Sequence, residues 1–220
     1  MPAGTARAVG EPEPSIPEVT AAIDRVWPRE IREGKRDASE REKKIGRLIL
    51  LLTVADRSGE RAVRRAEAMK EFDHKMVELR EEYTGDAPEV RAELEHTIRL
   101  YREALLLEPE LLNRPATFPT TRDAQLDLAG RVERVPAVVD RGEALLRELE
   151  YRVKRLSLLE QVGELRTATT RPGEDGRAAG ERLVAAQDLL KATDAAYAAQ
   201  AKFDRLTAPA TAPSTDPGHR

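Results

Sequence analysis

The chain has 220 residues, of which 40% are hydrophobic, 35% are charged and only 4% are aromatic. Its 37 basic and 40 acidic residues leave a net charge of −3, so no overall field attracts nucleic acid or a membrane surface. The absence of cysteine excludes disulfides, thiol catalysis and cysteine-ligated zinc. The first residues lack the apolar segment of a signal peptide, and the longest apolar run, Leu48–Ala55, is too short to cross a bilayer. We therefore expect a cytoplasmic protein without a membrane span.

The two ends differ in composition from the middle of the chain. Residues 1–16 and 207–220 are rich in proline and glycine and poor in large apolar side chains, which predicts disordered tails. Between them, leucine and alanine recur every three or four residues, as in amphipathic helices. We predict an all-α fold, an elongated coiled-coil-like bundle of two long antiparallel helical hairpins. The N-terminal helices and first hairpin occupy 17–112, a loop occupies 113–121, and the second hairpin occupies 122–206.

The first helices are marked by clear start signals. Pro17 suits a first turn, and the apolar spacing predicts a helix over Pro17–Val26. Ser39 and Glu42 form a capping-box pattern before the next helix. An apolar stripe then follows at spacings of three and four: Ile45, Leu48, Leu52, Ala55, Ala62, Ala66, Met69, Met76 and Tyr83. The pattern is compatible with one helix continuing through Gly59 and with a break at 57–60.

Residues 84–88 contain a glycine, an aspartate and a proline, which together predict the end of one helix and the start of the next. We expect the next helix to end near Leu107, before Pro109. One face of that helix carries apolar side chains: Val90, Leu94, Ile98, Tyr101 and Leu105. The short connection makes these two helices an antiparallel hairpin.

The second half repeats this organisation. Thr120 and Asp123 predict a helix start, and the helix runs to about Thr167 with a kink at Pro136. Its apolar stripe comprises Val132, Val135, Val139, Leu146, Leu149, Val153 and Leu156. After a turn at 171–176, the last helix carries a stripe that alternates four and three: Ala185, Leu189, Ala192, Ala196, Ala199, Phe203 and Leu206. Alanine at such positions favours closely packed antiparallel helices.

Two Glu-x-x-His pairs, Glu71 with His74 and Glu93 with His96, have the spacing found in di-iron carboxylate bundles. A helical wheel places both histidines away from the apolar stripes, on solvated faces. A di-iron site must face the interior, so we expect no metal and no cofactor.

Arg91 and His96 have the Arg-x4-His spacing of the catalytic motif of HEPN-type ribonucleases, which are helical bundles. The resemblance covers only six residues and implies that His96 moves a proton while Arg91 stabilises developing phosphate charge. Ala92 departs from the polar residue often found after the arginine in that family, and Glu93 and Glu95 would repel RNA. A ribonuclease using Arg91 and His96 is therefore an alternative to the leading hypothesis.

Basic side chains gather on two helix faces. One set comprises Arg57, Arg61, Arg64, Arg65 and Lys75, and the other comprises Arg147, Tyr151, Lys154 and Arg155. These faces predict, as a second alternative, a nucleic-acid-binding module. Because glutamates are interleaved with them, these basic residues are better explained as solvated helix faces, on which basic and acidic side chains four residues apart form ion pairs.

The leading hypothesis is a non-enzymatic helical interaction or assembly protein, a scaffold or adaptor acting through amphipathic helix faces. The expected partner is a second copy or another helical protein, and nucleic acid is less favoured. Leu48, Ile49 and Leu52 form the most apolar stretch and are the predicted contact. Six further side chains are predicted to bind the partner from the basic faces: Arg61, Arg64, Arg65, Arg147, Tyr151 and Arg155.

Overall fold

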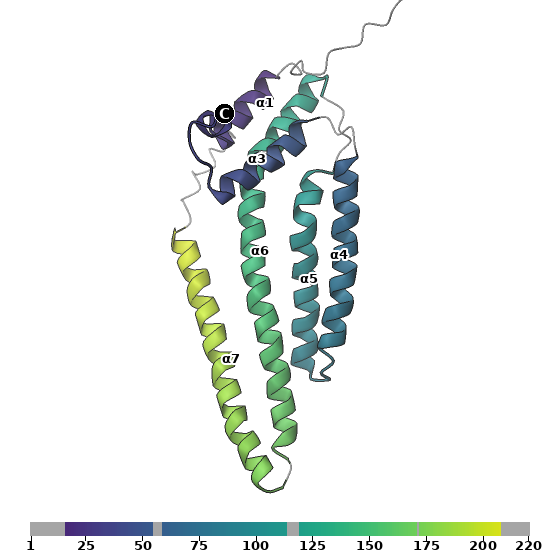
Figure 1. The fold of residues 1–220 in the computed structure, drawn as a ribbon, viewed down its shortest axis with the longest axis vertical. Helices are drawn as coiled ribbons and strands as arrows, with labels where there is room; N and C mark the ends of the chain where they lie inside the picture. The colour runs from purple at the N-terminus through teal and green to yellow at the C-terminus, as the bar shows by residue number, and fades with distance from the viewer. Residues whose placement is uncertain (1–15, 55–58, 114–118, 171, 208–220) are drawn as a thin grey trace, which may run out of the picture. The chain divides into compact units, whose positions relative to one another are not determined.

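The computed structural model describes residues 16–54, 59–113, 119–170 and 172–207, and every regular element in these ranges is an α-helix (Figure 1). The helices are α1 (Pro17–Val26), α2 (Arg29–Arg32), α3 (Glu40–Thr53), α4 (Glu60–Glu82), α5 (Pro88–Leu111), α6 (Arg122–Ala168) and α7 (Glu174–Thr207). The predicted all-α class is confirmed. The predicted disordered tails lie outside the described residues, except for their innermost positions, 16 and 207. Among the described helices, none combines the length and the apolar character needed to cross a bilayer.

The chain forms two compact units, each assembled from segments that are distant in the sequence. The first unit comprises Met1–Val77 and Arg99–Arg147, and the second comprises Glu78–Ile98 and Glu148–Arg220. Helices α4, α5 and α6 each contribute one end to each unit. Both units therefore contain residues from before and after the loop predicted at 113–121.

The first unit contains an apolar core between α1, α3 and α6. Its buried members are Ile16, Val19, Ala22, Ile45, Leu48, Ile49, Leu52, Leu112, Ala129, Val132, Val135 and Val139. Trp27, just after α1, packs on this cluster and lies against Gly46 of α3. A Cβ atom at position 46 would come within 2.5 Å of the indole ring, so only glycine permits this close approach.

The predicted capping box at the start of α3 is confirmed. The backbone N–H of Glu42 donates to Ser39 Oγ at 3.3 Å, and the backbone N–H of Ser39 donates to the Glu42 carboxylate at 2.9 Å. The bond from the Ser39 backbone to the carboxylate and the guanidinium of Arg36, 2.7 Å away, lower the pKa of Glu42 to about 2. The carboxylate thus stays charged at the helix N-terminus, where its negative charge interacts favourably with the positive end of the helix dipole.

The helix breaks before Gly59. Helix α3 ends at Thr53, and the next residue, Val54, has an extended backbone. Gly59 adopts a left-handed conformation with a φ of +69°, and α4 begins at Glu60. Glycine tolerates this conformation without the steric cost that a Cβ atom brings. Of the two alternatives open in the sequence, the structure has the break.

In α4 the buried face is rotated relative to the predicted stripe. Phe72 and Leu79 are buried, whereas Ala62 and Ala66 are exposed. Tyr83, just after α4, is buried as predicted. The prediction was wrong at these alanines because the larger side chains bury more apolar area when they face inward.

Helix α5 has the predicted apolar face, since Val90, Leu94 and Ile98 are buried. The predicted end near Leu107 was wrong, because α5 runs through Pro109 to Leu111. A proline removes one backbone hydrogen bond from a helix. The fully buried Leu112 anchors this last turn in the apolar core.

Helix α6 is one helix through Pro136. Most of its predicted stripe is buried, but Leu146 and Val153 are exposed and Leu145 is buried in their place. A straight helix has 3.6 residues per turn, so a strict heptad stripe drifts around it by about 20° per heptad. In the C-terminal half, the packed face therefore turns towards Leu145, Leu149 and Leu156, and Leu146 and Val153 leave it.

Candidate interaction surface

In the second unit, α6 and α7 pack side by side in opposite directions. The rings of Tyr151 and Tyr197 stack with centroids 3.9 Å apart and planes within 6°. Four residues further along α6, Arg155 Nε donates to Asp194 Oδ1 at 3.1 Å. The partner numbers fall along α7 as they rise along α6, so the two segments are antiparallel.

A buried carboxylate joins α5 to α6 in the same unit. Glu93 is only 6% exposed and accepts hydrogen bonds from Arg152 Nη1 at 3.1 and 3.3 Å and from Arg155 Nη1. An unpaired carboxylate at this depth would be strongly unfavourable, so both arginines are needed to hold its charge. The burial of Glu93 could have been predicted from the sequence, because Glu93 falls on the buried face of α5 between Val90 and Thr97.

The cluster extends to α7 through Tyr151, whose hydroxyl donates to Asp194 Oδ1 at 2.8 Å. Burial and then this hydrogen bond raise the pKa of Tyr151 to about 12. A phenol with so high a pKa stays protonated at neutral pH and does not serve as a general base. Glu93, Arg152, Arg155, Asp194 and Tyr151, here called the charge cluster, thus hold three helices together and present no reactive group.

Helix α7 has two largely apolar faces, and the inner one was not predicted. The residues on the inner face are Ala179, Leu183, Ala186, Leu190, Thr193, Tyr197 and Ala201, all of them buried or half-buried. The predicted stripe was expected to pack within the bundle, and its described side chains instead lie exposed. The side chain of its last member, Leu206, lies outside the described part of the chain. The inner face prevails because it carries Tyr197 and Asp194, which the charge cluster and the Tyr151 ring hold against α6.

The exposed stripe is here called the outer face of α7. Its described members are Ala185, Leu189, Ala192, Ala196, Ala199 and Phe203. Leu189 is 49% exposed and Phe203 is 60% exposed. The stripe lies about 120° around the helix from the inner face and is about 27 Å long. Asp188 and Lys202, both exposed, lie along one edge of it.

The predicted contact residues on α3 lie elsewhere than expected. Leu48, Ile49 and Leu52 are buried in the core of the first unit, and Leu48 is only 2% exposed. The chain's own helices cover this stripe, so no partner is needed to remove it from water. Leu50 of α3 and Val54, directly after it, are the apolar side chains exposed here.

The predicted basic faces are engaged in contacts within the chain. Arg61 donates from Nε to the carbonyl of Leu51 at 3.0 Å and from Nη2 to that of Leu52 at 3.1 Å. It thereby satisfies carbonyl groups at the end of α3, where a helix favours a cation. Arg64 pairs with Glu60 at 3.3 Å.

Of the other residues predicted on these faces, some are exposed and some are paired within the chain. Arg65 and Arg147 are exposed, and Arg57 lies outside the described residues. Asp194 brings Tyr151 and Arg155 together. These arrangements agree with the expectation that the basic faces consist mainly of solvated or internally paired side chains.

Arg91 and His96 have separate surroundings. Arg91 Nη2 donates to the carbonyl oxygen of Asp86 at 3.0 Å, whereas His96 Nε2 lies 3.7 Å from a Glu148 carboxylate oxygen. Five residues apart, they point in directions about 140° apart around α5. His96 is half-buried, so its predicted placement on a solvated face was wrong, because α6 packs over it.

Residues with metal-ligating side chains do not gather in the described part of the chain. His74 is exposed, as predicted, and Glu93 is engaged by arginines. Within the described ranges, no group of three or more histidine, aspartate or glutamate side chains has an arrangement that could hold a metal ion.

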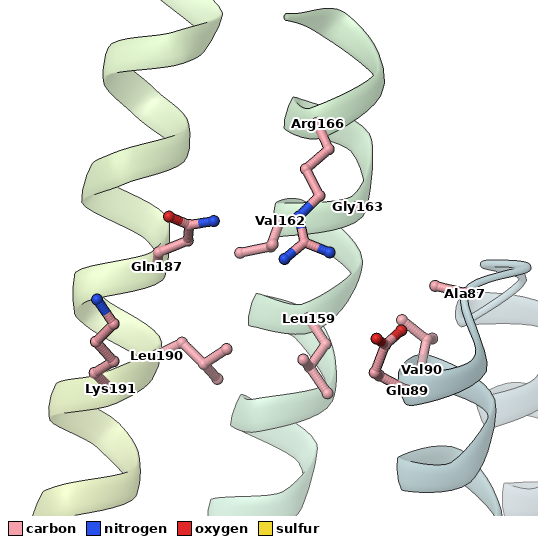
Figure 2. A pocket seen from close by; sticks show the side chains of 10 residues that line it. All are labelled: Ala87, Glu89, Val90, Leu159, Val162, Gly163, Arg166, Gln187, Leu190 and Lys191. Carbon is pink, nitrogen blue, oxygen red and sulfur yellow. The ribbon is translucent and has the colours of Figure 1, made fainter.

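A cleft of about 330 Å³ lies where α5, α6 and α7 meet in the second unit. Figure 2 shows that its lining side chains come from all three helices. Val90, Leu159, Val162 and Leu190 give it apolar walls, and Glu89, Arg166, Gln187 and Lys191 supply polar groups. Its single carboxylate and lack of histidine provide no pair for acid–base catalysis.

No protein-family model matches this chain, and neither the curated proteins nor the solved structures include a significant match. Any functional conclusion therefore depends on the side chains and faces described above.

Proposed function

We propose that this chain is a non-enzymatic helical interaction or assembly protein, a scaffold or adaptor that binds a helical partner on the outer face of α7. In this proposal the long helices form two antiparallel hairpins with coiled-coil-like packing. The observation that carries it is the second apolar face of α7, whose described side chains are exposed.

Two properties make the outer face suited to a helix. Alanine at three of its central positions, Ala192, Ala196 and Ala199, lets a second backbone approach closely. Leu189 and Phe203 still expose about half of their surface, and covering each gains about 1 kcal/mol. The stripe also keeps the regular four-and-three spacing typical of helix pairs.

The alternatives receive less support from the geometry. A ribonuclease needs Arg91 and His96 to act on one phosphate, but they contact different groups on different sides of α5. A nucleic-acid-binding module needs unpaired cations, but Arg61, Arg64 and Arg155 are held by carbonyl or carboxylate groups. The cytoplasmic location stays a prediction from the composition.

The proposal is tested by the mass of the purified full-length protein in solution, measured by light scattering at micromolar concentration. We expect a complex larger than one chain that dissociates on dilution. RNA cleavage is measured on the same sample and on His96→Ala. A compact monomer that cleaves RNA and loses this activity in His96→Ala would replace the proposal with the ribonuclease.

A further inference from the structure

We infer that the partner on the outer face of α7 is the outer face of α7 from a second copy of this chain, in antiparallel orientation. The inference rests on the proposed function and adds the identity, direction and register of the partner. It follows from two symmetries in the order of residues along the stripe.

The first symmetry is one of size. With Ala192 placed opposite Ala196 of an antiparallel second copy, Leu189 faces Ala199 and Phe203 faces Ala185. Each large side chain thus meets a small one, and each such pair occurs twice because the arrangement is two-fold symmetric. Side chains of alternating size interdigitate without voids, as a packed helix interface requires.

The second symmetry is one of charge. Asp188 and Lys202 lie on the same edge of the stripe, one position before Leu189 and Phe203. In an antiparallel pair, like edges of the two helices meet, so Asp188 faces Lys202 of the second copy and the reciprocal pair forms at the other end. In a parallel pair, this edge would meet the opposite edge of the second helix, where Asp188 faces the uncharged Thr193. Only the antiparallel direction therefore pairs these charges.

The inner face of α7 leaves room for this partner. Tyr197 and Asp194 hold the inner face against α6, and the outer face lies about 120° away around the helix. A helix can therefore pack on the outer face without displacing the contacts of the second unit. An interface of this kind uses one surface twice and closes at two copies, so it forms a dimer and no filament.

Charge exchange tests the register. Asp188→Lys and Lys202→Asp should each raise the dissociation constant of the dimer by about tenfold, and the double exchange should restore it to within about threefold. Ala192→Glu, in the centre of the stripe, should raise it by about a hundredfold or more. Ala198→Glu is the matched control, since Ala198 is an exposed alanine of α7 that lies outside the stripe. Sedimentation equilibrium gives the constants, and circular dichroism verifies the helix content.

Cross-linking tests the direction without disturbing the charges. Because the chain has no cysteine, Ala192→Cys and Ala196→Cys introduce single thiols. Under mild oxidation, a mixture of the two variants should form disulfide-linked dimers, and either variant alone should form few. Efficient linking of each variant to itself would show a parallel pair and overturn the inference.

The two proposals fail in different ways. A dimer whose dissociation constant is unchanged by Ala192→Glu and by both charge exchanges would overturn the α7 pairing and the use of the outer face, and leave standing an assembly protein that pairs through another surface. A protein that is monomeric at all accessible concentrations would overturn both.

Discussion

The two units of this protein are held together by different kinds of contact. The first unit has a core of valine, leucine and isoleucine from α1, α3 and α6. In the second unit, α7 contributes mainly small side chains to the packed face, and the charge cluster ties it to α5 and α6. Burial of apolar area is non-directional, whereas paired charges fix which residues meet. The second unit therefore depends on a few polar contacts to set its helix register.

This difference explains why α7 keeps an exposed apolar face. Both of its faces carry alanine and leucine and offer a neighbouring helix similar apolar area. Asp194 and Tyr197 lie on only one of them, and their contacts with Tyr151 and Arg155 bring that face inward. In the first unit, the large aliphatic residues of α3 decide the inward face by themselves, and Leu50 on the opposite side is exposed.

Leu48→Ala should give the largest effect and tests the apolar character of the first unit. Removing a buried leucine side chain leaves a cavity, so we expect the free energy of unfolding to fall by about 3–5 kcal/mol. Leu50→Ala, two residues away and 51% exposed, should change it by less than about 0.5 kcal/mol. Urea denaturation followed by circular dichroism measures both. Equal losses would contradict the placement of Leu48 in the core.

Glu93→Ala tests the charge cluster of the second unit. It leaves Arg152 and Arg155 without their shared partner, and we expect a loss of about 2–3 kcal/mol because both guanidinium groups remain partly solvated. Glu95→Ala removes an exposed carboxylate 3.7 Å from Arg80 and should cost about 0.5 kcal/mol or less. Thermal and urea unfolding at low and high salt distinguish them, since salt screens the exposed pair and much less the buried one. A Glu93 effect that vanishes in high salt would show that the cluster is solvated.

Gly46→Ala and Gly130→Ala, both in the first unit, should change the free energy of unfolding by smaller amounts and in opposite directions. A methyl group at position 46 meets the rigid indole of Trp27, so we expect a loss of about 1–3 kcal/mol and a shift in tryptophan fluorescence. No atom outside its own stretch of helix lies within 4 Å of a methyl group at position 130, so there alanine should stabilise the protein by about 0.5–1 kcal/mol through its higher helix propensity. If alanine at position 46 also stabilised the protein, the close contact with Trp27 would be disproved.

Local signals in the sequence were sufficient for the class of fold and for several helix ends. Pro17 at a first turn predicted α1 with its observed bounds, and the Ser39–Glu42 box predicted the start of α3. These features depend on residues within a few positions of each other, so the chain carries them without tertiary context. The end of α5 departed from such a rule, because the burial of Leu112 compensates for Pro109 inside the helix.

Which of the two apolar faces of α7 is covered was decided only by tertiary structure. The sequence of α7 shows an apolar stripe as regular as any in the chain, and it determined that some helix face there would be apolar. It did not determine that Asp194 would find Tyr151 and Arg155 on α6, because residues so distant in the chain meet only in the folded protein. Those contacts cover one face of α7 and leave the other exposed.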